Sequence, residues 1–337
     1  MVEDWLRVGL IVNPAAGSGI EVALHSARNA VAALGAEEVC TGVGQTGADA
    51  LAGWHGQVRT YGGGAASGRE QTCALARWLA DQRVAAVIVV GGDGTLADVA
   101  KVFIGLDCRT PVLGIGAGST NVGRLITCRT AEVRQLHSEN LETWEVDCLA
   151  ATANGNLLGH AFNDVVIGHT IVGTIDGRIR DIEAAEHMRG THKAGTPRSI
   201  GTNKTRVIRR SKGSETLVAQ GRSVGTVVAG FAEPAFFGKA VTGGICLASL
   251  TGLAAGCLVS SLPLVQVEIS AAALLQAAPV VSSYVTLSEE TSIVVENVQD
   301  GAVLCVDGNP LRRLNEADRV VISVRKGAVQ GIRFRRI

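Results

Sequence analysis

The sequence predicts an α/β domain with a parallel, Rossmann-like sheet, followed by a domain built mainly of antiparallel β-strands. In the first part, apolar runs of strand length alternate with helical patterns, and each run ends in glycines. After about residue 140, short β-branched runs are separated by Gly, Asn and Asp. The 337 residues suffice for two domains. We predict a first domain over residues 1–140 and a second over 141–337, and a return of the C-terminal segment to the first domain stays open.

The elements of the first domain follow one another as strand, glycine loop and helix. An apolar run covers Leu6 to Val12, and a helical pattern covers about Glu21 to Leu34. A strand followed by glycines recurs at Val58 to Tyr61, at Val84 to Val90 and at Pro111 to Ile115. This order predicts a parallel sheet with helices on both faces. In such sheets, ligands bind beyond the carboxyl ends of the strands, where all of these loops fall.

The second domain carries two strong turn signals. Asn154-Gly155 and Asp307-Gly308 each lie between strand-like runs, as hairpin turns do, and we expect Asp307 to be structural. The segment from 177 to 213 holds ten Lys or Arg against three acids. Such a segment is more often a solvated loop or hairpin than a phosphate clamp.

Composition excludes several classes of protein. Lys plus Arg equals Asp plus Glu at 31 each, so no global field favours nucleic acid as a partner. The eight cysteines form no C-x-x-C pair, and we expect reduced thiols. The N-terminus has acids where a signal peptide needs bases, which favours a cytoplasmic protein. From Ala240 to Ser288 the only charge is Glu268, but the Gly, Ser and Thr content and Pro263 favour buried helix and sheet over a membrane span.

The most informative run is VAAVIVVGGDGTLADVAKVF, which starts at Val84. It predicts a buried strand, a loop from Gly91 to Thr95, and a helix that begins near Leu96 with Thr95 as its cap. Backbone N–H groups and the positive end of the helix dipole favour a phosphate there. Asp93 would repel a phosphate unless it holds Mg²⁺ or a substrate hydroxyl, so this residue indicates catalysis. The alternative is a turn in which Asp93 is only a local cap.

Two further loops close neighbouring strands in the same way. IVNPAAGSG begins at Ile11 and presents Asn13, and PVLGIGAGSTNVGRL begins at Pro111. Three such loops at one edge of a sheet predict a nucleotide-sized anion site. No G-x-x-x-x-G-K-[ST] occurs, which excludes a Walker-type P-loop. The glycines at 114, 116 and 118 do not complete G-x-G-x-x-G, so a dinucleotide-dependent oxidoreductase is a weak alternative.

The order NPxxGxG, GGDGT and GxGAGSTN resembles the superfamily of NAD kinases and diacylglycerol or sphingosine kinases. AFNDVVIG is similar to the asparagine-acid pair of NAD kinases, which implies that Asn163 and Asp164 contact the adenosine part of the acceptor. TGGICLAS is loosely similar to the threonine-glycine substrate loop, which implies contacts from Thr242 and Gly243. The chain looks closest to the branch of predicted polyphosphate- or ATP-dependent NAD kinases, some of which are encoded with acetoin catabolism.

The sequence departs from both halves of this superfamily. Lipid kinases usually have Asn-Glu shortly after GGDGT, where this chain has Ala97-Asp98. NAD kinases have a Ser-Thr-Ala-Tyr run that is missing after Gly243. The resemblance therefore implies a kinase more strongly than it implies NAD as the acceptor.

The roles that follow make Asp93 the catalytic residue, which orients or deprotonates the acceptor hydroxyl. The residues expected to bind nucleotide or phosphate are Asn13, Gly91, Gly92, Gly94, Thr95, Gly116, Gly118, Ser119, Thr120 and Asn121. The residues expected to bind the acceptor are Asn163, Asp164, Thr242 and Gly243. The expected donor is ATP with Mg²⁺, or polyphosphate, and the metal ligands are not identified. We expect NAD as the acceptor, reaction in the interdomain cleft, and a homodimer or homotetramer. A lipid kinase and a non-catalytic nucleotide-binding regulator remain the alternatives.

Overall fold

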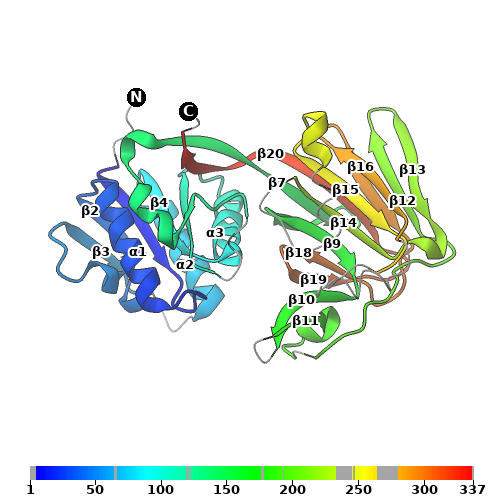
Figure 1. The fold of residues 1–337 in the computed structure, drawn as a ribbon, viewed down its shortest axis with the longest axis horizontal. Coiled ribbons are helices and arrows are strands. Elements are labelled where there is room, and N and C mark those ends of the chain that lie inside the picture. Colours follow the sequence, from blue (N-terminus) through cyan, green and yellow to red (C-terminus); the bar gives the residue numbers. More distant parts are fainter. Residues whose placement is uncertain are drawn as a thin grey trace. The chain divides into compact units, whose positions relative to one another are not determined.

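The computed structural model describes residues 5–63, 67–118, 121, 123–175, 178–191, 193–232, 245, 247–263 and 280–335. The chain forms two compact units, Met1–Asp147 with Lys326–Ile337, and Cys148–Arg325. Unit 1 is an α/β unit with a parallel sheet, and unit 2 is mainly antiparallel β, so the predicted fold class is confirmed (Figure 1). The division into a nucleotide domain and an acceptor domain stays a prediction.

The sheet of unit 1 has the strand order β5-β4-β1-β2-β3, and all of these strands are parallel. The strands are β1 Arg7–Val12, β2 Glu38–Gly42, β3 Gln57–Tyr61, β4 Ala86–Gly91, β5 Val112–Gly116 and β6 Cys128–Arg129, which pairs with β5. The helices are α1 Ile20–Ala33, α2 Gly68–Ala80 and α3 Asp93–Gly105, with 3₁₀ turns η1 Gly44–Thr46, η2 Ala48–Leu51, η3 Thr130–Gln135 and η4 Ser138–Asn140. The chain reverses its direction across the sheet between β1 and β4, which makes this the switch point where ligands bind in such folds.

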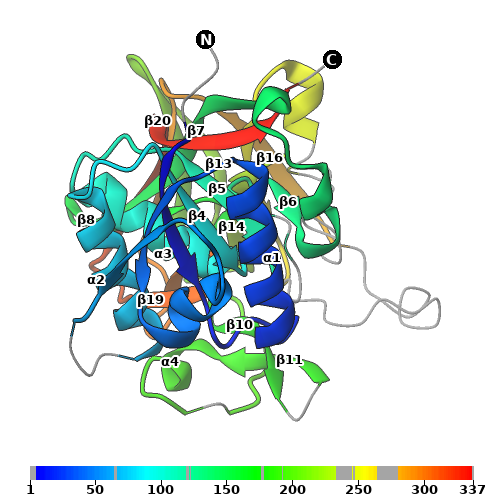
Figure 2. The ribbon, with the colours of Figure 1, turned by 90° about the vertical axis from the view of Figure 1, so that its left-hand side faces the viewer.

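Helices cover both faces of this sheet because alternate residues of β1 point to opposite sides. Leu10 and Val12 pack in one core with Ala27 of α1. On the other face, Gly9 lies against Leu79 of α2, and a Cβ atom at this position would lie 3.1 Å from the Leu79 side chain. Accordingly, α1 and α2 lie on opposite sides of β1 (Figure 2).

Unit 2 is a sandwich of two antiparallel sheets. One sheet has the order β13-β12-β17-β20, with β7 and β8 beside β20, and the other has the order β16-β15-β14-β9-β18-β19. The first contains β8 Asn156–Ala161, β12 Arg206–Ser211, β13 Ser214–Gln220 and β17 Ser292–Glu296, with the part of β7 (Leu141–Ala153) that follows Asp147 and the part of β20 (Arg319–Phe334) that precedes Lys326. The second contains β9 Asp164–Gly168, β14 Thr226–Phe231, β15 Ala255–Ser260, β16 Ser282–Leu287, β18 Val303–Val306 and β19 Asn309–Arg313. A separate hairpin, β10 Thr170–Ile175 and β11 Arg178–Glu183, precedes α4 Ala184–His187, and η5 Gly221–Ser223 and η6 Leu247–Thr251 are short 3₁₀ turns.

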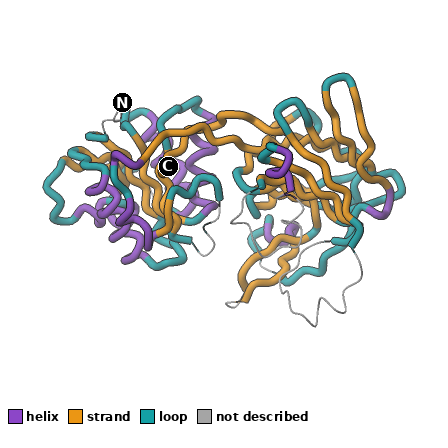
Figure 3. Tube along the Cα trace, turned by 45° about the horizontal axis from the view of Figure 1, so that its top comes forward, coloured by secondary structure: helices purple, strands orange, loops and turns teal. Residues whose placement is uncertain are grey.

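One buried core lies between the two sheets. It joins Val207, Ile293 and Val320 of the first sheet to Ile167 and Val227 of the second. Along the start of β20, Val320 and Ile322 are buried and Val321 between them is only partly buried, as expected when one face of a sheet is packed in a core. Figure 3 shows the resulting contrast, with helix concentrated in unit 1 and strand in unit 2.

Both predicted hairpin turns are confirmed. Asn154 and Gly155 connect β7 to β8 with φ angles of 52° and 81°. Asp307 and Gly308 connect β18 to β19 with φ angles of 49° and 74°. A two-residue turn with both φ angles positive matches the twist of the flanking strands, and Asn-Gly and Asp-Gly adopt it at low cost.

The uncharged stretch of unit 2 contains strands in its described part. All residues of β15 are buried, and β16 pairs with it along its whole length. Residues 264–279 of this stretch lie outside the described part. Among the described residues, no helix has the length and apolarity needed to cross a membrane.

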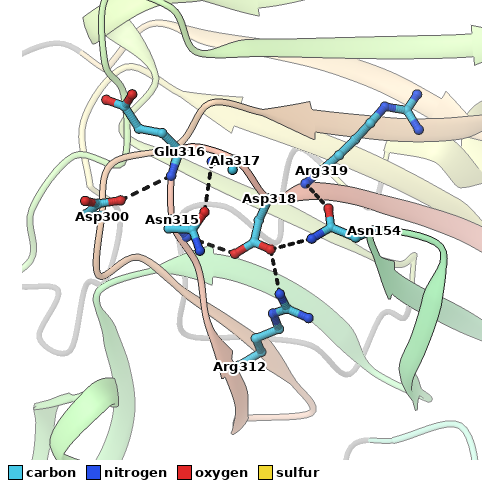
Figure 4. Close-up of polar contacts among 8 residues, drawn as sticks. All are labelled: Asn154, Asp300, Arg312, Asn315, Glu316, Ala317, Asp318 and Arg319. Atoms are coloured by element: carbon cyan, nitrogen blue, oxygen red, sulfur yellow. Dashed lines mark hydrogen bonds and ion pairs between the residues drawn. The ribbon is translucent and has the colours of Figure 1, made fainter.

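A buried carboxylate ties the first hairpin to the start of β20 (Figure 4). Asp318 is 3% exposed, and its Oδ1 accepts hydrogen bonds from Asn154 Nδ2 at 2.7 Å and from Arg312 Nη2 at 2.6 Å. Its Oδ2 accepts from the backbone N–H of Asn315 at 3.0 Å. Asn154 Oδ1 in turn accepts from the backbone N–H of Arg319. Both carboxylate oxygens are therefore satisfied, as a buried charge requires.

Candidate active site

The three glycine loops lie at one edge of the unit 1 sheet. In the strand register, Val12 pairs with Val90, and Gly91 pairs with Gly116, so β1, β4 and β5 end side by side. We name the segments that follow these strands loop 1 (residues 13–19), loop 2 (92–95) and loop 3 (117–123). The sequence predicted this edge because parallel strands point their carboxyl ends in one direction.

Loop 1 is joined to loop 2 through Asn13. Its backbone N–H donates to the carbonyl of Val90, and its Nδ2 donates to Thr95 Oγ1 at 2.9 Å. Its Oδ1 accepts from the backbone N–H of Ala15 at 3.0 Å, which closes an Asx turn. Both polar ends of the Asn13 side chain thus hold the loops in shape.

Loop 3 is held by Asn121, whose φ angle is 53°. Its Oδ1 accepts from the backbone N–H of Gly118 at 2.7 Å, and its Nδ2 donates to the Gly118 carbonyl at 2.6 Å. The backbone N–H of Ser18 in loop 1 donates to the carbonyl of Ala117 at 2.8 Å, which ties loop 1 to loop 3. Ser119 and Thr120 lie outside the described residues.

Loops 2 and 3 touch through their backbones. A Cβ atom added to Gly118 would lie 2.7 Å from the Cα atom of Gly92, closer than real Cβ atoms approach a backbone. Only glycine fits at this contact. The glycines at this contact therefore bring the two loops together.

Helix α3 begins at Asp93 with Gly92 as its N-cap, so the predicted start near Leu96 is wrong. Thr95 is not the cap, since no side chain caps this helix and the Thr95 hydroxyl accepts from Asn13 instead. The Thr95 hydroxyl, which the local sequence predicted as a cap, instead forms a hydrogen bond with a residue distant in the sequence. The uncapped end presents N–H groups without intrahelical acceptors, together with the positive end of the dipole, and such an end favours an anion.

Asp93 carries the carboxylate of this site. Its Oδ1 accepts a hydrogen bond of 2.7 Å from the backbone N–H of Gly123 in loop 3. This contact completes a closed set in which each of the three loops is bonded to the other two. The geometry thus brings together Asn13, Thr95, Gly118 and Asn121 around the start of α3, with one acidic side chain among them.

Unit 2 contains the asparagine-acid pair at the start of β9. Asp307 Oδ1 accepts from the backbone N–H groups of Asn163 at 2.8 Å, Phe162 at 3.0 Å and Asp164 at 3.3 Å. The backbone N–H of Asp307 donates to the carbonyl of Asp164 at 2.9 Å. Asp307 therefore fixes the backbone that carries Asn163 and Asp164. Thr242 and Gly243 lie outside the described residues.

The donor set fits a magnesium ion that is carried mainly by the nucleotide. Among the described residues, no group of three or more His, Cys, Asp or Glu side chains is arranged to hold a metal. Mg²⁺ commonly takes one or two carboxylates, several waters and the substrate phosphates, so the single carboxylate of Asp93 is compatible with it. The described residues offer no further cluster of metal ligands.

Two features of the site escaped sequence reasoning. The sequence predicted no role for Gly123, although its backbone N–H donates to the Asp93 carboxylate. Asp307 was expected to be structural, but its contact with residues 162–164, more than 140 positions away, was not foreseen. The second glycine of GSTNVGRL, Gly123, and the Asp307-Gly308 turn were visible in the sequence. Nothing in the sequence indicated which residues they would bond to.

Comparisons with known proteins agree with this geometry. A family model described as the ATP-NAD kinase N-terminal domain matches residues 8–125, which include all three loops. An uncharacterized protein of Archaeoglobus fulgidus is 30% identical over 250 residues, 74% of this chain and 74% of the relative.

Solved structures show the same fold at low identity. A diacylglycerol kinase from Bacillus anthracis str. Sterne is 16% identical with a TM-score of 0.50, and the match covers 97% of this chain and 96% of that one. Yeast NADH kinase complexed with NADH is 13% identical with a TM-score of 0.52, and the match covers 98% of this chain and 84% of that one. The chain belongs, through residues 8–125, to the family of the ATP-NAD kinase N-terminal domain, and it shares its fold with the diacylglycerol kinase and with yeast NADH kinase.

Proposed function

We propose that this protein transfers the γ-phosphoryl group of ATP to a hydroxyl of a small molecule, with the 2'-OH of the adenosine ribose of NAD as the leading acceptor. The observation that carries the proposal is the uncapped start of α3, where three interlocked loops surround the carboxylate of Asp93. A phosphotransferase needs a helix N-terminus that can bind phosphate and, beside it, a carboxylate that can act on the acceptor hydroxyl. At a site that only bound phosphate, this negative charge would repel the ligand.

Phosphoryl transfer requires positioning and neutralisation of charge more than covalent chemistry from the protein. The N–H groups at the start of α3 would hold donor phosphate oxygens, beside the loop 3 residues that are predicted to share this task. Mg²⁺ bound with ATP would supply further neutralisation. Asp93 would orient the acceptor hydroxyl and take its proton as the oxygen bonds to the γ-phosphorus and the bond to ADP breaks.

The acceptor is assigned from unit 2. The assignment of Asn163 and Asp164 as acceptor contacts is supported by the rigid backbone that Asp307 gives them. The neighbour crystallised with NADH makes NAD the first acceptor to test. Membership in the polyphosphate- or ATP-dependent branch and the oligomeric state stay predictions.

One observation favours a lipid acceptor as the second candidate. Unit 2 exposes apolar side chains near its uncharged stretch, with Leu250 81% and Val281 73% exposed. Exposed apolar side chains of this kind suit contact with a lipid surface. The diacylglycerol kinase of the same fold gives this candidate a second line of support.

An ADP-release assay with a panel of acceptors tests the proposal. We expect turnover with ATP, Mg²⁺ and NAD, and none when NADP replaces NAD, because its 2'-oxygen is already phosphorylated. Turnover only on vesicles that contain diacylglycerol would make the lipid candidate correct. Nucleotide binding without turnover on NAD, NADH, nucleosides, sugars or lipids would identify a non-catalytic regulator and contradict the proposal. The same acceptors are tested with polyphosphate in place of ATP, and turnover with one or the other identifies the phosphoryl donor.

A further inference from the structure

The hydrogen bond between Asp93 and Gly123 joins the two halves of the phosphate site. Asp93 is the first residue of α3, and Gly123 lies 30 positions later in loop 3. The 2.7 Å distance from Gly123 N to Asp93 Oδ1 is at the short end for an N–H donor and typical of a charged acceptor. The donor is a backbone group, so its position is set by the path of the chain.

The described residues of loop 3 have contacts of their own. Asn121 closes on Gly118 with two hydrogen bonds, and Gly118 is pressed against Gly92. The carbonyl of Gly123 accepts a hydrogen bond of 3.0 Å from the backbone N–H of Ile126. Gly123 is therefore held by a contact other than its bond to the carboxylate. A carboxylate bonded to such a donor loses rotational freedom about its side-chain bonds.

We propose that the backbone N–H of Gly123 is a positioning group that aims the Asp93 carboxylate at the acceptor hydroxyl. This inference rests on the proposed function. Loop 3 then has two tasks, because the segment that is predicted to bind donor phosphates also fixes the catalytic carboxylate of Asp93. A misplacement of about 1 Å in a reacting group can cost about 10²-fold in rate, so this bond should act on kcat.

The test removes one hydrogen-bond donor and leaves the side chain unchanged. Gly123→Ala keeps the backbone N–H, and lactic acid placed at position 123 has the same methyl group but an ester oxygen in place of the N–H. We expect kcat of the ester protein to be about 10- to 100-fold below that of Gly123→Ala, with the KM for ATP within about threefold. The ratio of these two proteins cancels any effect of the added methyl group.

The KM and kcat readouts separate positioning from a structural role. If the ester protein and Gly123→Ala have the same kcat within about threefold, the inference is overturned. If the ester raises the KM for ATP as much as it lowers kcat, the bond maintains the donor site as a whole, and the inference is equally wrong.

A second measurement does not depend on turnover. In ¹⁵N-edited NMR spectra, the amide proton of Gly123 should resonate downfield, because it donates to a carboxylate. The resonance should move upfield in Asp93→Ala, which removes that carboxylate. If the resonance moves in this way but no substrate hydroxyl is phosphorylated, the proposed function fails while the hydrogen bond stands. If the Gly123 resonance is the same in Asp93→Ala, the positioning role fails whatever the enzyme turns over.

Discussion

At the residue scale, the asparagines of loops 1 and 3 form hydrogen bonds within and between the loops. Asn13 uses both polar ends on Ala15 and Thr95, and Asn121 uses both on Gly118. These residues were predicted to bind nucleotide through their side chains, and that role stays a prediction. The geometry supports a division of labour in which side chains shape the loops, backbone N–H groups bind phosphate, and Asp93 acts on the acceptor.

Asp93→Asn tests the role of the carboxylate. The amide oxygen of Asn can still accept the N–H of Gly123, so loop 3 should keep its shape and the melting temperature should change little. Turnover should fall by about 10² to 10⁴-fold, the usual value of a positioned base, while ATP affinity holds or rises because a negative charge beside the phosphates is gone. Steady-state kinetics and ATP titration measure both. Turnover within about threefold of wild type would show that Asp93 is not the base.

Asn163→Ala tests the acceptor assignment. We expect a higher KM for the acceptor and an unchanged Kd for ATP. Stability should change little, because the buried Oδ1 of Asn163 has no hydrogen-bond partner among the described residues. Asp307→Ala is the contrast: it removes the acceptor of three backbone N–H groups and should lower the free energy of unfolding by about 1 to 3 kcal/mol. Equal losses of donor and acceptor affinity in Asn163→Ala would contradict the assignment.

At the element scale, loops and hairpins are joined by close contacts between segments distant in sequence. The approach of Gly118 to Gly92 brings the loop after β5 to the start of α3. The Asp318 carboxylate connects the β7–β8 turn, the end of β19 and the start of β20. In both places, the contacts of one residue join separate elements.

Gly118→Ala should push loops 2 and 3 apart. Its Cβ would lie 2.7 Å from backbone, so we expect a loss of about 1 to 3 kcal/mol in the free energy of unfolding and weaker ATP binding. Gly105→Ala is the matched control, because a Cβ at the end of α3 meets nothing within 4 Å. That control should be neutral or stabilise by up to about 1 kcal/mol. Urea unfolding compares the two, and equal stability would show that the contact tolerates a side chain.

Asp318→Asn should destabilise unit 2. The NH₂ group of Asn replaces one carboxylate oxygen, so a hydrogen-bond donor would face the donor that this oxygen accepted from. We therefore expect a loss of roughly 2 to 3 kcal/mol in the free energy of unfolding. Asp300→Asn, in the same group of residues but exposed, keeps an oxygen for the N–H of Glu316 and should change stability by less than about 0.5 kcal/mol. Similar losses in both variants would contradict the importance of burial at Asp318.

At the scale of the whole molecule, the chain has no net charge, so local groups set its response to pH. His169 is 3% exposed, and its Nδ1 lies 3.1 Å from the carbonyl of Gly301. Burial and then the Arg198 guanidinium lower the pKa of His169, against opposing effects of the Gly301 and Ser199 carbonyls and of Glu183. The folded protein therefore holds this imidazole neutral at pH values where the unfolded chain begins to protonate it.

We predict that stability falls as the pH drops below about 6.5, the ordinary pKa of histidine. Between that pH and the lower pKa of the folded state, the unfolded chain binds more protons, so acid favours unfolding; above it the contribution of His169 is constant. The loss is complete once the pH falls below the folded pKa. Urea unfolding from pH 5 to 8 should give a smaller slope in His169→Gln than in wild type. Identical slopes would exclude a contribution from His169.

The sequence determined the features that depend on local conformation and periodicity. Alternating and continuous apolar runs fixed the two kinds of sheet, Asn154-Gly155 and Asp307-Gly308 fixed two turns, and the parallel order placed all glycine loops at one edge. These follow from the steric limits of the backbone and the repeat of each element, which act over a few residues.

Only the tertiary structure decided which groups meet at the site. Helix α3 begins at Asp93, and the Thr95 hydroxyl accepts from Asn13, 82 positions away, instead of capping the helix. The partners of Asp93 and Asp307 lie 30 and more than 140 positions from them. Such contacts depend on the packing of whole strands and loops, and a short sequence window carries no record of which distant N–H a carboxylate will bind.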